Sequence, residues 1–236
     1  MNSKIYFNPT WAKTRQGLNI PLWSSQAPET LHGRQGRNPI LFIGGVHGDE
    51  PEGVWLAEAF LNAIQTEYLK RAHTTSSTWP GRNWILIPCL NPEGYERQER
   101  TNSAGVDLNR NFPSTDWSPE AKAPRYNPGA QPGSEPEVQA TIRAINLFKP
   151  ELIIHFHSWQ PCVVYTGSPG ASVARQIGEH AGYEYREDIG YPTPGSLGQY
   201  GWLNHKTPVI CIEEREGTAR ELIWPRFEWA LMDLLK

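Results

Sequence analysis

The sequence contains little of the chemistry that stabilises small secreted proteins. Its 236 residues include only three cysteines, Cys89, Cys162 and Cys211, which are odd in number and far apart in the chain. Two of the three lie in apolar runs. We therefore expect free, buried thiols and a reducing, cytoplasmic compartment, and no disulfide framework.

Long apolar runs and a strong charge of one sign are missing as well. No stretch of about 18 apolar residues is present, so the sequence predicts no membrane-spanning helix. The first residues include no apolar segment typical of a signal peptide. The formal net charge is −3 and the sequence pI is near 6.2. Without a basic face, neither nucleic acid nor a membrane surface is an expected partner.

What is present is an alternation of short apolar runs with helix-like segments. The expected strands are residues 40–43, 84–87, 152–157 and 208–212. The expected helices are residues 51–72, 134–147, 171–181 and 218–235, the second opened by a capping box with Ser134 as its N-cap. This order predicts one α/β domain over residues 1–236, with a mixed, mostly parallel central sheet and helices on both faces. The long irregular segment 91–133 is of a length that usually serves function.

The first strand ends in the most informative motif of the chain, which contains His47 and Glu50. An imidazole nitrogen and a carboxylate oxygen are ordinary zinc ligands, and catalytic zinc usually takes three protein ligands and leaves one position open. His157 ends the third predicted strand and Glu213 ends the fourth. Because ligands bind at the carboxyl ends of strands in such sheets, these four side chains together predict a metal site.

The segment from Arg100 to Pro113 adds arginines, amides and one carboxylate to this edge of the sheet. Arginine side chains bind carboxylates through two parallel hydrogen bonds. Asp107 is suited to orient a metal-bound histidine through the second ring nitrogen of that histidine. The segment therefore predicts a place for an acidic ligand beside the metal.

Four motifs together resemble the zinc carboxypeptidase family in order and spacing, from about Pro39 to the C-terminus. They are His47-Gly48-Asp49-Glu50, Asp107-Leu108-Asn109-Arg110-Asn111-Phe112, Phe156-His157-Ser158 and Ile210-Cys211-Ile212-Glu213. The resemblance implies a zinc-dependent hydrolase with one Zn²⁺ per chain that cleaves an amide bond next to a free C-terminal carboxylate. It leaves the first 35 or so residues unexplained.

The resemblance also implies a role for each matching residue. His47, Glu50 and His157 would hold the zinc ion, with His155 as a supporting or packing residue. Glu213, or its neighbour Glu214 as the alternative, would be the general base.

Further roles follow for residues beside the metal. Arg100 would stabilise the oxyanion, Asn109 and Arg110 would bind the substrate carboxylate, and Asp107 would support His47. The substrate-capping tyrosine of the family has two candidates here, Tyr191 and Tyr200.

Three further strings, residues 102–113, 132–137 and 190–198, resemble a small bacterial, cytoplasmic branch of the family. That branch removes meso-diaminopimelate from the γ-D-glutamyl bond of murein tripeptide during peptidoglycan recycling. The alternative enzyme is an N-acyl amino-acid deacylase of the succinylglutamate desuccinylase and aspartoacylase type, which shares the first two motifs. A non-catalytic peptide-binding module is a third reading, and the retention of Arg100, Glu213 and three metal ligands argues against it.

Overall fold

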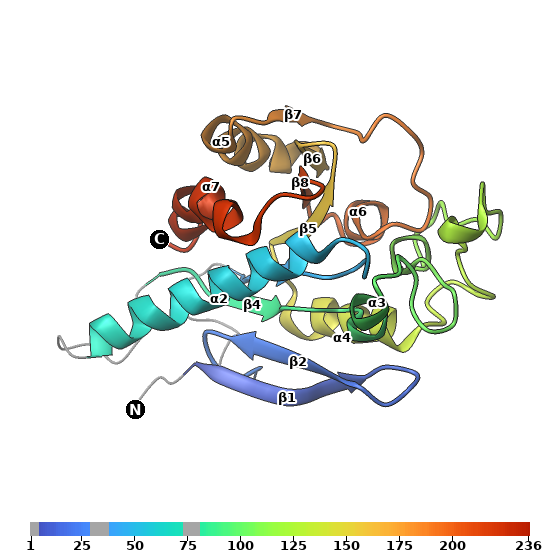
Figure 1. Ribbon diagram of the computed structural model, residues 1–236, viewed down its shortest axis with the longest axis horizontal. Coiled ribbons are helices and arrows are strands. Elements are labelled where there is room, and N and C mark those ends of the chain that lie inside the picture. Colours follow the sequence, from blue (N-terminus) through green and yellow to red (C-terminus); the bar gives the residue numbers. More distant parts are fainter. Residues whose placement is uncertain (1–4, 29–37, 73–80) are drawn as a thin grey trace.

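A computed structural model describes residues 5–28, 38–72 and 81–236 of the chain (Figure 1). One eight-stranded sheet runs through the molecule in the order β1-β2-β4-β3-β5-β8-β6-β7. The strands are β1 (Tyr6–Lys13), β2 (Asn19–Ser24), β3 (Ile40–Ile43), β4 (Trp84–Ile87), β5 (Leu152–Trp159), β6 (Cys162–Thr166), β7 (Glu184–Arg186) and β8 (Val209–Arg215). The helices are α2 (Pro51–Ala72), α3 (Pro92–Arg97), α4 (Pro136–Phe148), α5 (Ala171–Ala181), α6 (Leu197–Gln199) and α7 (Arg220–Asp233). The predicted α/β fold is confirmed.

The four central strands, β4, β3, β5 and β8, are parallel to one another. Every residue of β3 and of β4 is buried, as expected for short apolar strands that are covered on both faces. Antiparallel strands extend the sheet at its two edges: β2 pairs with β4, and β6 pairs with β8. The mixed, mostly parallel sheet of the sequence prediction is therefore correct.

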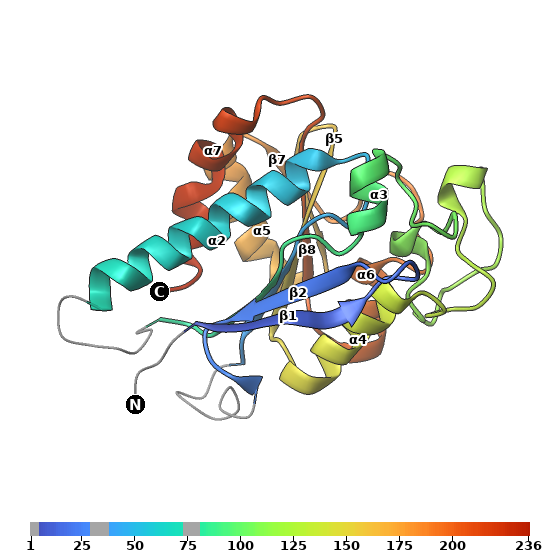
Figure 2. The same ribbon diagram turned by 60° about the horizontal axis from the view of Figure 1, so that its bottom comes forward.

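Two apolar cores lie on opposite faces of this sheet. On one face, Phe42 packs edge-on against Phe60 of α2, and the same core includes residues of α5 and α7. On the other face, Leu41 and Ile43 belong to the core that α4 completes. Successive residues of a strand point to opposite faces, so one short strand contributes to both cores. Figure 2 shows α2, α5 and α7 on one side of the sheet and α4 on the other.

The N-terminal segment that the family resemblance left unexplained forms the β1–β2 hairpin at one edge of the sheet. Trp23 of β2 is the register partner of Leu86 in β4. Trp11 of β1 packs against Phe148 of α4, and its indole nitrogen donates a hydrogen bond to the Ala140 carbonyl oxygen at 3.2 Å. The hairpin is therefore an integral part of the core on the α4 side.

The predicted capping box at the start of α4 is wrong. The N-cap residue is Glu135, without a side-chain capping bond, and the Ser134 hydroxyl donates to the Glu135 carboxylate at 2.7 Å. Glu137 is fully buried, and its carboxylate accepts a hydrogen bond from the Asn102 amide at 3.3 Å. The same amide donates to Glu135 at 2.8 Å. The two glutamates fasten the loop that contains Asn102 and do not close a local capping ring.

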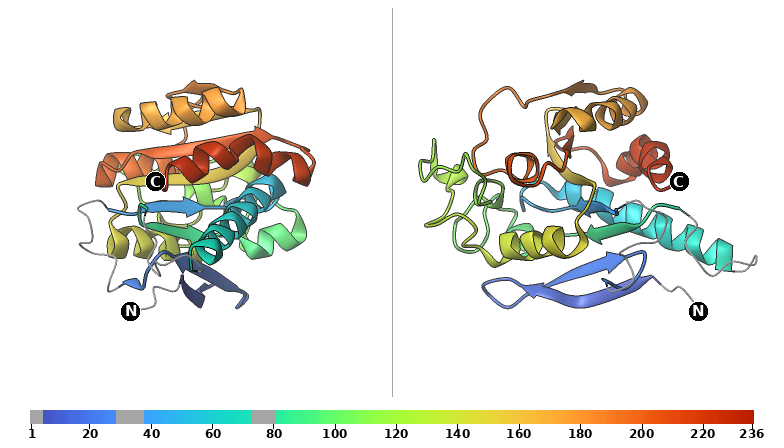
Figure 3. Two further views of the ribbon diagram at one scale, coloured as in Figure 1. Left: turned by 90° about the vertical axis from the view of Figure 1, so that its left-hand side faces the viewer. Right: turned by 180° about the vertical axis from the view of Figure 1, so that it is seen from behind.

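Two long connections meet at one end of the molecule, the loop after α3 and the loop of residues 187–196 (Figure 3). The backbone N–H of Phe112 donates to the Gly195 carbonyl oxygen at 2.9 Å, which joins them. Gly195 has φ +71°, and a Cβ there would collide with the Arg110 carbonyl oxygen. The close approach of the two loops therefore requires glycine at this position. No helix in the described ranges is long and apolar enough to cross a membrane.

Candidate active site

The predicted site residues come together at the carboxyl ends of β3, β5 and β8. His157 near the end of β5 is the direct register partner of Glu213 on β8. His47 and Glu50 lie in the turn between β3 and α2, and β3 is the other neighbour of β5. All four side chains line one cavity of about 740 Å³. The sheet topology therefore assembles residues that are up to 166 positions apart in the sequence.

Three side chains converge on one point as metal ligands would. The Nδ1 atoms of His47 and His157 are 3.0 Å apart, and each lies 2.7 Å from an oxygen of Glu50. Two ring nitrogens that face each other cannot both act as hydrogen-bond acceptors, and a cation between them resolves this conflict. Two imidazoles and one carboxylate form the ligand set of many catalytic zinc sites. The geometry fits a zinc ion.

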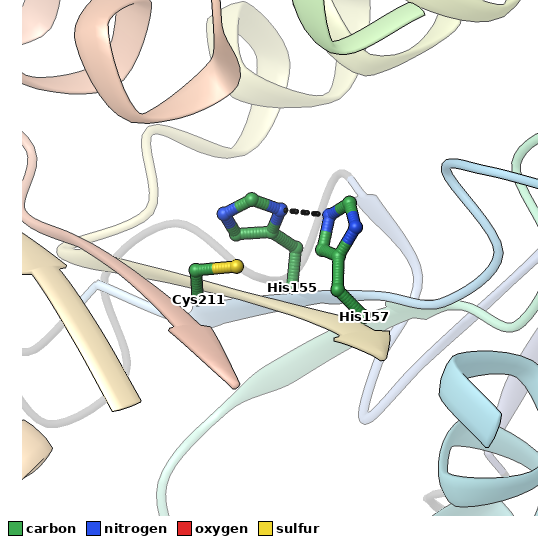
Figure 4. Close-up of side chains that lie close together, drawn as sticks. All are labelled: His155, His157 and Cys211. Atoms are coloured by element: carbon green, nitrogen blue, oxygen red, sulfur yellow. Dashed lines mark hydrogen bonds between the residues drawn. The ribbon is translucent and has the colours of Figure 1, made fainter. Parts of the chain in front are cut away.

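The outer ring nitrogens of both histidines have partners that fix their tautomers. His47 Nε2 lies 3.1 Å from Asp107, so its N–H donates to this buried carboxylate. His157 Nε2 lies 2.7 Å from His155 Nδ1, as the dashed line in Figure 4 shows. Burial lowers the pKa of His155 well below its usual range, so its neutral ring accepts this hydrogen bond. Both Nδ1 lone pairs are thereby turned toward the metal position, an arrangement typical of zinc histidines.

Charge at the centre is balanced by close contacts. Burial disfavours the charged form of Glu50, but His47 and His157 keep the pKa of Glu50 well below its usual range. Burial also opposes the charge of Asp107, and His47 and Arg100 keep its pKa low. Both carboxylates are therefore ionised at neutral pH, as a metal ligand and its supporting anion must be.

Glu213 has the environment of a general base. Its side chain is buried, and burial, together with the negative charge of Glu50, raises the pKa of Glu213 to about 8. The Cys211 thiol donates to one carboxylate oxygen at 3.3 Å, and the other oxygen has no partner among the described residues. A carboxylate with a free oxygen and a raised pKa is suited to accept a proton. Its free oxygen and its place beside the three ligand side chains favour Glu213 as the candidate base.

The alternative base, Glu214, is engaged elsewhere. Its carboxylate accepts hydrogen bonds from the Tyr183 hydroxyl at 2.6 Å and from Arg226 at 2.5 Å. Successive residues of a strand point to opposite faces, so Glu214 of β8 points away from the face that holds Glu213. The structure favours Glu213 over Glu214.

The two arginines predicted to act beside the metal differ in how far carboxylates neutralise their charge. Arg100 donates to Asp107 at 3.0 Å and to Glu50 at 3.1 Å. Arg110 lines the cavity, and no described carboxylate lies within ion-pair distance of it. Asn109 lies beside it, and its side-chain oxygen accepts from the Leu197 backbone N–H at 2.9 Å. An arginine without a carboxylate partner next to a metal site is suited to an anionic ligand.

The two candidates for the substrate-capping tyrosine lie in different places. Tyr191 lines the cavity, is 38% exposed and packs edge-on against Trp159. Tyr200 is buried against Phe112 and His205 and is not among the described residues that line the cavity. Tyr191 is therefore the candidate that the geometry favours.

Two cavity residues had no signal in the sequence. Arg125 and Tyr126 line the same cavity, but they lie in the irregular segment, outside any motif. Asp49 also lines the cavity, and it lies within the first motif, where no role was predicted for it. The position of Cys211 in the cavity could have been predicted from the sequence. It lies two residues before Glu213, and side chains two residues apart on a strand point to the same face.

Comparison with known proteins identifies the class. The family model for zinc carboxypeptidases matches residues 5–196. Murein peptide amidase A of Escherichia coli K12 is 31% identical over 201 residues, which span 79% of this chain and 73% of that protein.

Two solved structures share the fold. The murein-tripeptide amidase of E. coli O157 superimposes with a TM-score of 0.74 at 22% identity, over 97% of this chain and 90% of that one. Carboxypeptidase A of Helicoverpa armigera gives 0.77 at 15% identity, over 98% and 68%.

The fold and the site define a zinc metallohydrolase, and the chain belongs to the zinc carboxypeptidase family. The matched region extends to residue 5 and so includes the hairpin that the sequence motifs left out. Zinc is the metal of this family, and the cluster of His47, Glu50 and His157 fits it. This membership makes the chain a hydrolase, which removes the reading as a non-catalytic module.

Proposed function

We propose that this enzyme removes meso-diaminopimelate from the γ-D-glutamyl bond of small murein peptides. The observation that carries the proposal is Arg110, a cavity-lining guanidinium without a carboxylate partner among the described residues, in a chain that is similar over most of its length to murein peptide amidase A. Arg110 and Asn109 bind the free carboxylate of the released residue. A carboxylate held there places the adjacent amide bond next to the zinc centre.

The chain's own residues perform the proton transfers in this proposal. When bound, the zinc ion supplies Lewis acidity, which makes a water molecule acidic and polarises a carbonyl group. Glu213 takes a proton from the attacking water on its unpartnered oxygen and later delivers this proton to the leaving nitrogen. Arg100 stabilises the negative charge that develops on the carbonyl oxygen, and losing one such donor typically costs about 10²–10³ in rate.

Supporting contacts keep the three metal ligands in position. Asp107 and His155 hold the rings of His47 and His157. The Ser158 backbone N–H donates to Glu50 at 3.3 Å, and the Ser158 hydroxyl donates to the buried Glu52 at 2.6 Å. The ligands are thus in place before substrate arrives, which keeps the reorganisation on substrate binding small.

The pathway that we propose, peptidoglycan recycling, follows from the proposed substrate, and the setting that we propose is the cytoplasm. The support for this setting is that Cys89, Cys162 and Cys211 are all unpaired. Unpaired, partly buried thiols are typical of a reducing compartment.

A panel of three substrates tests the proposal with the zinc-loaded enzyme. The panel contains a γ-D-glutamyl-diaminopimelate peptide, an ordinary α-linked peptide with a free C-terminus, and an N-acyl amino acid. We expect the highest kcat/KM on the γ-linked peptide. Faster turnover of the α-linked peptide, with none of the γ-linked one, would leave a carboxypeptidase and remove the murein substrate. Preference for the N-acyl amino acid would overturn the proposal altogether.

A further inference from the structure

A third guanidinium that lines the cavity has no role in the chemistry described so far. Arg125, in the turn Pro124–Tyr126, lines the cavity that contains the zinc ligands. Its only ion pair within the described ranges is with Asp49, at 3.3 Å. Asp49 lies in the turn that carries both His47 and Glu50, so this contact holds the arginine over the metal loop.

The three arginines of the cavity are arranged around the ring of Tyr126. The guanidinium carbons of Arg100, Arg110 and Arg125 lie 5.3, 5.7 and 5.6 Å from the centre of this ring. Stacking on an aromatic ring fixes the plane of a guanidinium while its N–H groups stay free for hydrogen bonds. Three cations therefore surround one ring at the wall of the site.

The three arginines differ in how many carboxylates they contact. Arg100 is bound by two buried carboxylates, Asp107 and Glu50. Arg110 has no carboxylate partner in the part of the chain that the structure describes, and Arg125 has one long contact with Asp49. A guanidinium carries five N–H donors, and among the described residues one side chain, Asp49, accepts from Arg125. The cavity thus offers two arginines to anionic groups of a substrate.

The two arginines differ in depth. Arg110 is 8% exposed, whereas the Arg125 side chain is 57% exposed. If Arg110 holds the carboxylate of the released residue, as proposed above, the outer arginine faces the part of the substrate that lies nearer the entrance. That part is the acyl side of the cleaved bond.

We infer that Arg125 is a specificity residue that binds a second substrate carboxylate, on the acyl side of the cleaved bond. This inference rests on the proposed function and deepens it. In a γ-linked glutamyl residue the α-carboxylate is free, and a short methylene chain separates it from the carbonyl that is attacked. An ordinary neutral residue at the same place offers no such charge. Arg125 therefore distinguishes glutamyl amides from other peptides.

The experiment compares two γ-linked peptides that differ in one group. The first has the free α-carboxylate on its D-glutamyl residue, and the second has this carboxylate converted to an amide. A charge-assisted contact of this kind is worth about tenfold, so wild-type enzyme should prefer the free acid by about tenfold in kcat/KM. Arg125→Gln should bring this ratio close to one, and Arg125→Lys should retain part of it.

The matched control is Arg143→Gln. Arg143 is also an exposed arginine on an aromatic ring, with its guanidinium carbon 4.0 Å from the centre of Trp11, but it is not among the cavity residues. We expect the wild-type ratio in this variant. An equal loss on both peptides in Arg125→Gln, or no preference in the wild type, would overturn the inference.

Failure of the proposed function gives a different result. If neither γ-linked peptide is cleaved, the ratio of kcat/KM is measured instead on two α-linked peptides, one with glutamyl and one with glutaminyl on the acyl side of the cleaved bond. The glutamyl side-chain carboxylate lies at the same separation from the cleaved carbonyl, and the glutaminyl side chain replaces it by an amide. If the preference for the carboxylate over the amide in these α-linked peptides is lost in Arg125→Gln, the inference holds and the γ-linked substrate is ruled out. A ratio of one in both enzymes removes the inference as well.

Discussion

His157 and Glu213 are register partners on the adjacent parallel strands β5 and β8. A proposed metal ligand and the proposed base are therefore held side by side by a backbone ladder, and not by a flexible loop. The same ladder pairs His155 with Cys211, each of which lies two residues earlier on its strand. Because side chains two residues apart share a face, each functional residue has its supporting residue directly beneath it. This arrangement makes the following predictions specific to single positions.

The two histidines of β5 should differ in their effect on zinc. His157→Ala removes a ligand, so we expect severe loss of zinc at equal total metal. His155→Ala removes only the acceptor of the His157 N–H, so zinc should remain near full occupancy at saturation, with affinity lowered by about 10- to 100-fold. Metal analysis after dialysis and competition with a chromophoric chelator measure both. The reverse order would show that the ligand assignment is wrong.

Replacing the proposed base should stop turnover without releasing metal. Glu213→Gln keeps the shape of the side chain and removes its basicity, so kcat should fall by at least about 10²-fold. The matched control is Glu214→Gln on the same strand. It weakens the contacts with Arg226 and Tyr183, so we expect activity to persist and stability to fall by about 2 kcal/mol. An inactive Glu214→Gln with an active Glu213→Gln would contradict the assignment.

The free carboxylate of the substrate should be required. Amidating the C-terminus removes a charge-assisted contact worth roughly 1.5–3 kcal/mol, so kcat/KM should drop by about 10- to 150-fold. Arg110→Ala should lower the rate on the free acid and remove most of the difference between the two peptides. Paired kinetics on free and amidated peptides check this. Equal cleavage of both by the wild type would refute the requirement.

Glu137 should make stability depend on pH. Burial raises the pKa of Glu137 to about 7, from an ordinary value of 4.5. Between these values the folded protein binds more protons than the unfolded chain. The free energy of unfolding should therefore decrease as pH rises from about 4.5 to about 7, by about 3 kcal/mol, and stay low above it.

The Glu137→Gln variant isolates this contribution. A glutamine can still accept the hydrogen bond from Asn102 but does not titrate, so its stability should not show this decrease and should exceed the wild type above pH 7. Denaturant unfolding across the pH range measures it. Glu221→Gln, an exposed carboxylate in the first turn of α7, is the control and should behave like the wild type. A wild-type profile in Glu137→Gln would contradict the pKa assignment.

The sequence by itself determined the central strands, most of the helices and the members of the metal cluster. Apolar runs such as Ile40–Ile43, which are too short for a helix and alternate with helical segments, favour strands buried on both faces. Ligand residues after such runs must meet at one edge of a parallel sheet. His47, Glu50, His157 and Glu213 could be predicted for this reason, because the alternation of strands with helices implies parallel strands and the ligand chemistry can be read from the residue types.

Only the tertiary structure decided which loop residues join the site. Arg125 and Tyr126 belong to an irregular segment without periodicity, so nothing local places them at the cavity that contains the metal ligands. The N-cap of α4 was mispredicted for a related reason. The pattern at Ser134 satisfies a local rule, but burial against Asn102 takes Glu137 out of the local hydrogen bond. Long-range contacts between loops depend on how separate elements pack, and a pattern of neighbouring residues does not contain that information.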